Sequence, residues 1–134
     1  MNQQFTHESL KSLADQYGSP LYVYYAESIK QQYEKLTHAF SKCNARMFYA
    51  CKSLTNINVL RYIHSLGASL DCVSINEVKL GLMAGFEKEN ILYTPNCVDF
   101  EEILEAKELG VNINIDNISI LEQFGNRFSN SYPI

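Results

Sequence analysis

The sequence predicts an α/β fold built on parallel strands. Short apolar segments alternate with amphipathic helical stretches from Arg46 onward, and four candidate strands begin near residues 47, 69, 91 and 111. The near-even spacing of these starts suits a repeating unit of one strand, one helix and two short connections. Because strand–helix–strand repetition is typical of parallel sheets with right-handed crossovers, we expect the strands to run in one direction.

The first 45 residues predict two helices and one separate strand. A short helix is expected around His7–Gln16, before the break at Gly18-Ser19-Pro20. Leu21–Tyr25 is rich in aromatic and aliphatic residues and is predicted to be a strand. A second helix is marked by apolar residues at helical spacing: Ile29, Tyr33, Leu36 and Phe40.

The first two repeating units have readable ends. Met47–Cys51 is the first predicted strand, and the helix after it carries an apolar stripe over residues 59–66 and stops at Gly67. Ser69–Val73 is the second strand. Ser74 and Glu77 then form the pattern of a capping box at the start of the next helix, which Gly85 ends.

The last two units follow the same pattern. Ile91–Tyr93 is the third predicted strand, and the helix after it begins at Asp99 and ends at Gly110. Val111–Ile115 is the fourth strand, and either Asp116 or Asn117 begins the final helix.

Two architectures fit this repetition: an open doubly wound sheet and a (β/α)8 TIM barrel. A barrel normally needs about 250 residues, whereas this sequence of 134 residues holds about four βα units. Half of a barrel would leave two sheet edges unpaired. If the fold is a barrel, we therefore expect a partial one, from residue 26 to 134, preceded by an N-terminal segment over residues 1–25 and belonging to a longer chain.

The composition of the chain limits the classes of molecule that it is expected to bind. A net charge of −4 and a pI near 5.3 give no general attraction to nucleic acids or anionic membranes. No apolar run approaches the ~20 residues that span a bilayer, and the first residues lack the pattern of a secretory signal. The sequence therefore predicts a cytoplasmic protein with a small-molecule ligand, and neither a nucleic acid nor a membrane as partner.

The cysteines and histidines do not predict a metal site or a disulfide. The four cysteines are far apart and form no CxxC pair, so we expect all of them to be small, mostly buried apolar residues. The three histidines lie in polar helical stretches without ligand spacing and are expected at the surface: His7, His38 and His64.

Lys52 is the candidate catalytic residue. If the first strand belongs to a barrel, alternation places Phe48, Ala50 and Lys52 on one face, with Lys52 at the C-terminal mouth where such barrels keep their chemistry. An amine in an apolar cleft has its charged form disfavoured, and it can then act as a Schiff-base nucleophile. The alternative is a solvated lysine at the end of a strand. Ala50 beneath it would leave room for a bulky group.

These motifs resemble a known family. Phe48-Tyr49-Ala50-Cys51-Lys52 is similar to the pyridoxal-phosphate lysine motif of the alanine-racemase-like barrel decarboxylases. The resemblance continues through Gly67–Ser74 with Glu77, and through Ala84-Gly85-Phe86, Ile91–Asn96 and Gly110–Asp116. The opening Tyr17–Tyr24 is similar to the start of diaminopimelate decarboxylases in particular. The motifs cover nearly the whole chain, in order and at barrel spacing.

The resemblance implies a function and a set of site residues. It implies decarboxylation of meso-2,6-diaminopimelate to L-lysine and carbon dioxide, with pyridoxal 5'-phosphate as cofactor, Lys52 as its covalent anchor and Ala50 beside it. Asp71 either lies beside the cofactor or caps the following turn. Ser74 and Glu77 are explained by helix capping. The family's phosphate-binding and substrate-binding residues and its C-terminal β-domain, which the N-terminal segment would join, lie beyond Ile134.

Several alternatives stay open. Substrate selection also depends on residues beyond Ile134, so an ornithine or arginine decarboxylase or a racemase is the alternative within the same fold. A small-ligand-binding α/β module without catalysis is the alternative of another class. For the decarboxylase we expect a homodimer at full length, and residues 1–134 alone are expected to be inactive.

Overall fold

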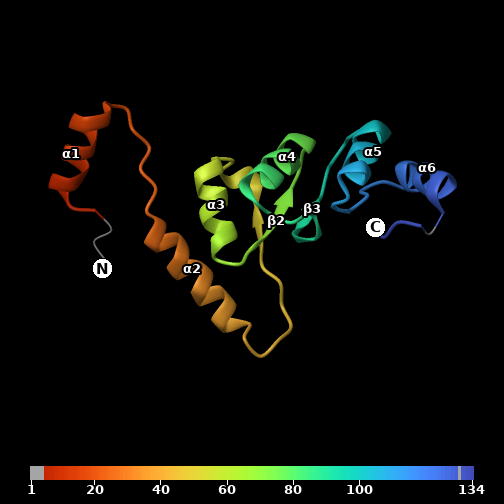
Figure 1. Ribbon diagram of the computed structural model, residues 1–134, viewed down its shortest axis with the longest axis horizontal. Coiled ribbons are helices and arrows are strands. Elements are labelled where there is room, and N and C mark those ends of the chain that lie inside the picture. The colour runs from red at the N-terminus through yellow and green to blue at the C-terminus, as the bar shows by residue number, and fades with distance from the viewer. Residues whose placement is uncertain (1–4, 130) are drawn as a thin grey trace. The chain divides into compact units, whose positions relative to one another are not determined.

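The computed structural model describes residues 5–129 and 131–134, which fall into two compact units, Met1–Lys42 and Cys43–Ile134. The first unit contains helix α1 (His7–Tyr17) and helix α2 (Ala26–Ala39), both predicted from the sequence (Figure 1). Leu21–Tyr25 is not a strand, because among the described residues no neighbouring strand pairs with it. Within the described part of the chain, no helix is both long enough and apolar enough to cross a membrane.

The second unit is built on one parallel sheet whose strands lie in chain order. The four strands are β1 (Phe48–Ala50), β2 (Ser69–Cys72), β3 (Ile91–Tyr93) and β4 (Asn112–Ile113). Each strand pairs in parallel with the next one along the chain. All four predicted strands are present, although β1 and β4 are shorter than the sequence suggested.

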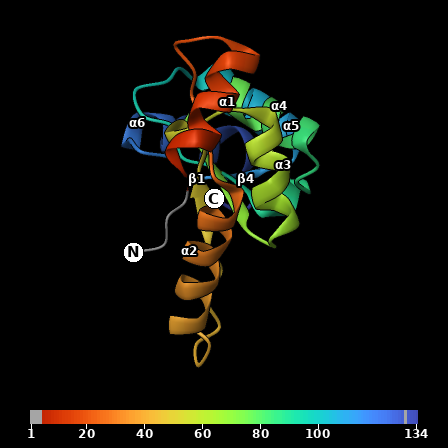
Figure 2. The same ribbon diagram turned by 90° about the vertical axis from the view of Figure 1, so that its left-hand side faces the viewer.

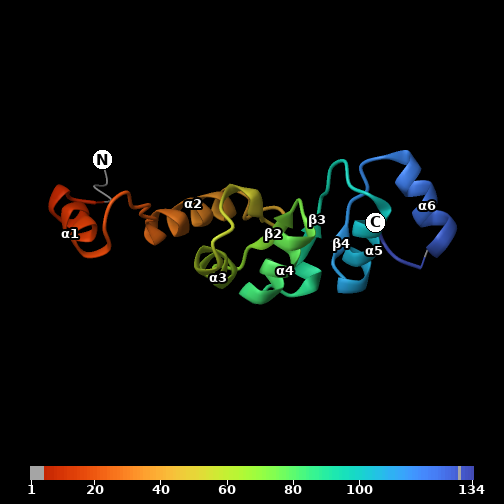
Figure 3. The ribbon, with the colours of Figure 1, turned by 90° about the horizontal axis from the view of Figure 1, so that it is seen from above.

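Helices connect the strands and all cover the same face of the sheet. The connections are, in order, the 3-10 turn η1 (Cys51–Ser53) with α3 (Ile57–Ser65), α4 (Ile75–Ala84) with the turn η2 (Lys88–Asn90), and α5 (Phe100–Leu109); α6 (Ile118–Phe128) follows β4. Figures 2 and 3 both show α3, α4 and α5 on one side of the strands. A sequential order with right-handed crossovers puts every connecting helix on one face, whereas a doubly wound sheet reverses its order and has helices on both. The arrangement is therefore part of a (β/α)8 barrel.

The two faces of the sheet differ in burial. On the side that faces the helices, Tyr49 of β1 is half-buried and the residues of the other strands are buried. With Cys51 of η1 and apolar residues of α3, α4 and α5, these buried strand residues form the core: Leu70, Cys72, Ile91, Tyr93 and Ile113. The opposite face, which would line the interior of a barrel, carries the exposed residues Phe48 and Asn112 and the partly exposed residues Ala50, Asp71 and Leu92. Within the described residues, only the face that the helices cover is shielded from solvent along most of its length.

The helix ends confirm most of the predicted signals. Asp99 and Asn117 accept backbone N–H groups as the N-caps of α5 and α6, which settles the choice between Asp116 and Asn117. Gly85 and Gly110 end α4 and α5 with φ of 105° and 76°. Glycine adopts this left-handed conformation without the steric cost of a Cβ.

Gly81 is the point of closest approach between α4 and the sheet. A Cβ at Gly81 would overlap Cδ2 of Leu70 and come within 3.3 Å of Cδ1 of Ile91. Leu70 and Ile91 are both fully buried. The absence of a side chain at Gly81 therefore lets α4 lie against β2 and β3.

Gly81→Ala tests this close approach, with Gly125→Ala as its matched control. Gly125 is also helical, but a Cβ there meets nothing within 4 Å, so its replacement should stabilise the fold by up to ~1 kcal/mol through helix propensity. Gly81→Ala has the same gain but must displace the packed Leu70, an overpacking cost of about 1–3 kcal/mol. We expect a net loss of about 1 kcal/mol in urea unfolding. Equal stabilisation by both substitutions would contradict the close packing.

Candidate functional site

Lys52 lies just beyond the carboxyl end of β1, in the 3-10 turn Cys51–Ser53. The strand ends at Ala50, so the strand alternation used to place Lys52 does not reach it. The side chain is exposed rather than enclosed by apolar groups. Among residues 5–129 and 131–134, no ion pair within 4 Å involves its ammonium group. Lys52 is thus an accessible primary amine at the strand end where parallel barrels carry their chemistry.

Ala50 and Asp71 are direct neighbours on the sheet face that the helices leave uncovered. The register pairs Ala50 of β1 with Asp71 of β2, and both residues are partly exposed. In a parallel sheet, paired residues share a face. The short Ala50 side chain therefore leaves space on this face between Phe48 and the start of the Lys52 turn.

Thr94 holds the Asp71 carboxylate from the neighbouring strand. It follows β3 directly, and its hydroxyl donates a hydrogen bond of 2.5 Å to Oδ1 of Asp71. The Thr94 backbone N–H donates to the carbonyl of Cys72, which extends the ladder between β2 and β3. A donor of this kind fixes a carboxylate in one orientation. The Asp71 carboxylate therefore has a hydrogen-bond partner across the sheet.

The sequence analysis gave Thr94 no role, although a signal was present. Asp71 pairs with Leu92 across β2 and β3, and period-two alternation places Thr94 on the same face as Leu92. The pairing register, which sequence spacing leaves undefined, determines that this threonine and this aspartate meet.

Ser74 and Glu77 begin α4, but not as a complete capping box. The Ser74 hydroxyl accepts the Glu77 backbone N–H at 3.3 Å, as predicted. The Glu77 carboxylate instead accepts the N–H of Val73 at 2.8 Å, one residue before the N-cap. This shift turns the carboxylate toward the end of β2, where it lies close to the thiols of Cys51 and Cys72.

Two of the four cysteines are buried and two are exposed. Cys51 and Cys72 are fully buried, as expected for all four, whereas Cys43 and Cys97 are exposed. Cys97 lies in the loop after β3 with a φ of 57°, and its N–H donates to Oδ2 of Asp116 in the loop after β4. That hydrogen bond joins two loops at the carboxyl end of the sheet.

The donor set around Lys52 fits an aldehyde cofactor. An accessible primary amine can form a reversible covalent bond to a carbonyl carbon. Ala50, a small residue, precedes the Lys52 turn on the uncovered face, and the Asp71 carboxylate, which accepts a hydrogen bond from Thr94, is paired with it there. These features match the requirements of pyridoxal phosphate at its aldehyde end.

Comparison with a described family agrees with this chemistry. The family described as "Pyridoxal-dependent decarboxylase, pyridoxal binding domain" matches residues 26–132. Its match includes β1 to β4 and Lys52, and begins at the first residue of α2. The compact units of the structure divide after Lys42, within the matched range.

Curated relatives are diaminopimelate decarboxylases. The chain is 45% identical over 111 residues to the diaminopimelate decarboxylase of Methanothermobacter thermautotrophicus, covering 81% of this chain and 26% of that protein. It is 32% identical over 108 residues to the enzyme of Campylobacter jejuni, covering 80% of this chain and 27% of the relative. The chain thus spans about a quarter of the curated relatives it matches.

Solved structures of two substrate types have a similar fold. Lysine/ornithine decarboxylase from Vibrio vulnificus, complexed with putrescine, is 27% identical with a TM-score of 0.80, over 92% of this chain and 35% of that one. Diaminopimelate decarboxylase from Helicobacter pylori, complexed with L-lysine, is 26% identical with a TM-score of 0.81, over 87% and 30%. With the family match over residues 26–132, these likenesses show that the chain belongs to the pyridoxal-dependent decarboxylases and contains strands of their pyridoxal-binding barrel.

Proposed function

We propose that the protein carrying this chain is a diaminopimelate decarboxylase, which converts meso-2,6-diaminopimelate to L-lysine and carbon dioxide. The observation that carries the proposal is Lys52, an accessible amine at the carboxyl end of β1 within a matched pyridoxal-binding domain. The choice of substrate rests on sequence, because the curated relatives with 45% and 32% identity are named diaminopimelate decarboxylases.

Lys52 would hold the cofactor, with Ala50 and Asp71 beside it. An amine bonds to a carbonyl carbon only in its unprotonated form, so Lys52 must give up a proton when it takes the aldehyde and regain one when it is released. Pyridoxal phosphate, when bound, supplies an electron sink for the negative charge left on carbon when carbon dioxide departs.

Asp71 contributes orientation and charge. Its carboxylate is fixed by Thr94 on the same face as Ala50, and it can accept a hydrogen bond from a cationic group placed there. Ala50 keeps that space open, since a larger side chain would project into it. Thr94 acts through Asp71 and is therefore a positioning residue.

One observation favours a second class of substrate, lysine and ornithine. The lysine/ornithine decarboxylase of Vibrio vulnificus has a TM-score of 0.80 to this chain, similar to the diaminopimelate decarboxylases. The barrel strands alone therefore do not separate the two substrate classes.

We also propose, from the family resemblance, a homodimer that acts in the cytoplasm.

Lys52→Arg tests the covalent anchor. Because a guanidinium stays protonated near neutral pH, the variant should keep its charge and lose covalent attachment of pyridoxal phosphate. In the protein carrying this chain, borohydride reduction and peptide mapping should label Lys52 above the other lysines. Lys88→Arg, which changes another lysine within a 3-10 turn, is the matched control and should leave labelling intact. Labelling that persists in Lys52→Arg would refute the assignment.

Thr94→Val tests the positioning of Asp71. Valine has a similar shape but cannot donate to the carboxylate, so we expect kcat/KM for decarboxylation to fall about tenfold, the equivalent of one hydrogen bond to a charged group. Thr94→Ser keeps the hydroxyl and should retain most of the activity. A urea unfolding curve for both variants separates lost positioning from lost stability. Equal activity of the valine and serine variants would show that the hydroxyl has no role.

The substrate is tested by competing amino acids. Carbon dioxide release from meso-2,6-diaminopimelate, L-ornithine, L-lysine and L-arginine should give the highest kcat/KM for diaminopimelate, by at least ~100-fold. A preference for ornithine or lysine would support the second substrate class. Absence of release from all four, with Lys52 still labelled by borohydride, would point to a different reaction on the same cofactor.

A further inference from the structure

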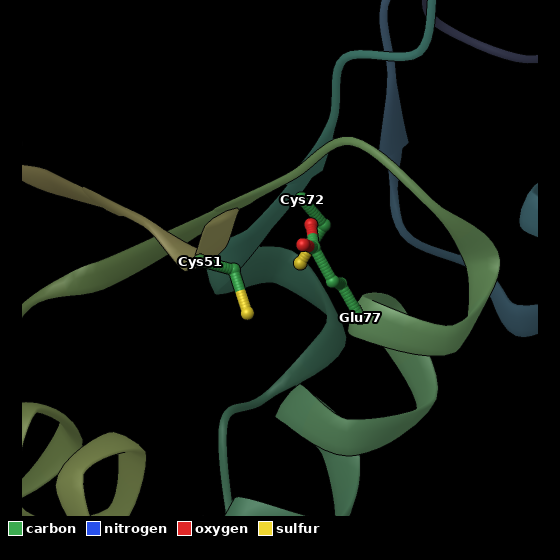
Figure 4. Close-up of side chains that lie close together, drawn as sticks. All are labelled: Cys51, Cys72 and Glu77. Carbon is green, nitrogen blue, oxygen red and sulfur yellow. The ribbon is translucent and has the colours of Figure 1, made fainter. Parts of the chain in front are cut away.

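The helix-covered face of the sheet brings together two buried thiols and a carboxylate. Cys51 comes from η1, Cys72 ends β2, and Glu77 lies in the first turn of α4. Their ligand atoms all lie within 4.8 Å of one another. Figure 4 shows Glu77 reaching toward Cys72, with Cys51 beside them. All three residues lie within the motifs described above, but neither the sequence analysis nor the proposed decarboxylation gives them a joint role.

We propose that Cys51, Cys72 and Glu77 form a binding site for one thiophilic divalent cation of the Zn²⁺ type. Thiolates and carboxylates are ligands that Zn²⁺ takes at about 2.3 Å and 2.0–2.2 Å. Tetrahedral geometry with these bond lengths separates neighbouring ligand atoms by ~3.5–3.8 Å. The observed separations of up to 4.8 Å therefore require a closure of about 1 Å, within the range of side-chain adjustment.

The electrostatics of the cluster favour a cation. Burial, with the negative charges of Glu77 and Asp71, raises the pKa of the Cys51 thiol to about 11 and also raises the pKa of Cys72. The Glu77 carboxylate places a negative charge within 4.8 Å of both thiols, and a divalent cation bound there would stabilise the two thiolates. Cation binding would displace the two thiol protons to solvent, with two thiolates and one carboxylate as ligands.

The side chains are already held in place for this role. Cys51 and Cys72 are both 0% exposed, so the surrounding core restricts their side chains. The Glu77 carboxylate is fixed by the N–H of Val73 through Oε2, and a carboxylate retains further lone pairs for a metal. Three protein ligands leave a fourth position, which Zn²⁺ fills with water in sites of this kind.

A disulfide between the same cysteines is the less favoured interpretation. Disulfide formation removes two electrons from the thiols and therefore needs an oxidant, and both cysteines are free thiols in the structure. The site is also distinct from the Lys52 face: Cys51 points into the helix-covered core, while its neighbour Lys52 is exposed. A bound cation would join η1, β2 and α4 behind that face.

The test uses a variant that keeps only the two relevant thiols. The chain has four cysteines, so Cys43→Ser combined with Cys97→Ser removes the two exposed ones and leaves Cys51 and Cys72. The reduced, metal-free double variant is titrated with Co²⁺ alone and then with Zn²⁺ alone. We expect one Co²⁺ per chain, a thiolate-to-cobalt charge-transfer band, displacement of that band by Zn²⁺, and a higher Tm with Zn²⁺ that a chelator reverses.

Further substitutions in the same background assign the ligands. Cys51→Ser or Cys72→Ser should abolish the charge-transfer band of a pair of thiolates, and Glu77→Gln should weaken Co²⁺ binding at least tenfold. Glu102→Gln is the matched control, because Glu102 has the same place in the first turn of α5 as Glu77 has in α4. It should bind Co²⁺ as the background variant does.

Three outcomes would overturn the proposal. The first is the absence of a thiolate band in the double variant, and the second is a band that appears only when Cys43 or Cys97 is present. The third is isolation of a Cys51–Cys72 disulfide from reduced, metal-exposed protein. If a serine variant at Cys51 or Cys72 fails to fold, the double variant still decides, because Cys51 and Cys72 are the only thiols that it retains within residues 1–134. None of these outcomes depends on decarboxylase activity.

Discussion

The burial of one face of a parallel sheet beneath three helices is the constraint on which the second unit depends. Parallel strands cannot be joined by tight turns, so each connection must cross over, and here each crossover is a helix that returns on the same side. Leu70, Ile91 and Tyr93 are fully buried on that side. The phenolic O–H of Tyr93 donates to the Glu102 carboxylate at 3.2 Å, which links β3 to the first turn of α5 without leaving a buried hydroxyl unpaired.

One-sided coverage leaves the other face free for chemistry. Ala50, Asp71 and Thr94 lie on this face or at its carboxyl end, and Lys52 lies in the turn just beyond it. The strands supply position, because hydrogen bonds between neighbouring strands fix which residues are adjacent. The turn supplies accessibility, because Lys52 has left the ladder and its amine is exposed. Covalent attachment of a cofactor needs both properties: strand residues held in fixed positions and an amine that the cofactor can reach.

The helix-covered face carries a cluster of two thiols and a carboxylate at the same end of the sheet. Cys51 and Lys52 are consecutive, yet one thiol is enclosed by the core and the next side chain is exposed. A 3-10 turn at a strand end places consecutive residues in different environments in this way. The structure thereby brings Cys51, Cys72 and Glu77 together behind the residues that carry the proposed decarboxylase chemistry.

The sequence by itself determined the number and order of the strands and α-helices between Phe48 and Phe128, but not the 3-10 turns η1 and η2. It also gave Lys52 as the candidate anchor and Asp71 as a candidate neighbour of the cofactor, through a family resemblance carried by motifs that are local properties of the chain. Only the tertiary structure excluded the doubly wound sheet, because strand order is a long-range property. Only the register revealed the contact between Thr94 and Asp71. The failed expectations at Leu21–Tyr25 and at Cys43 and Cys97 have the same origin, since a strand needs a partner and burial needs covering neighbours, and neither can be read from the residue itself.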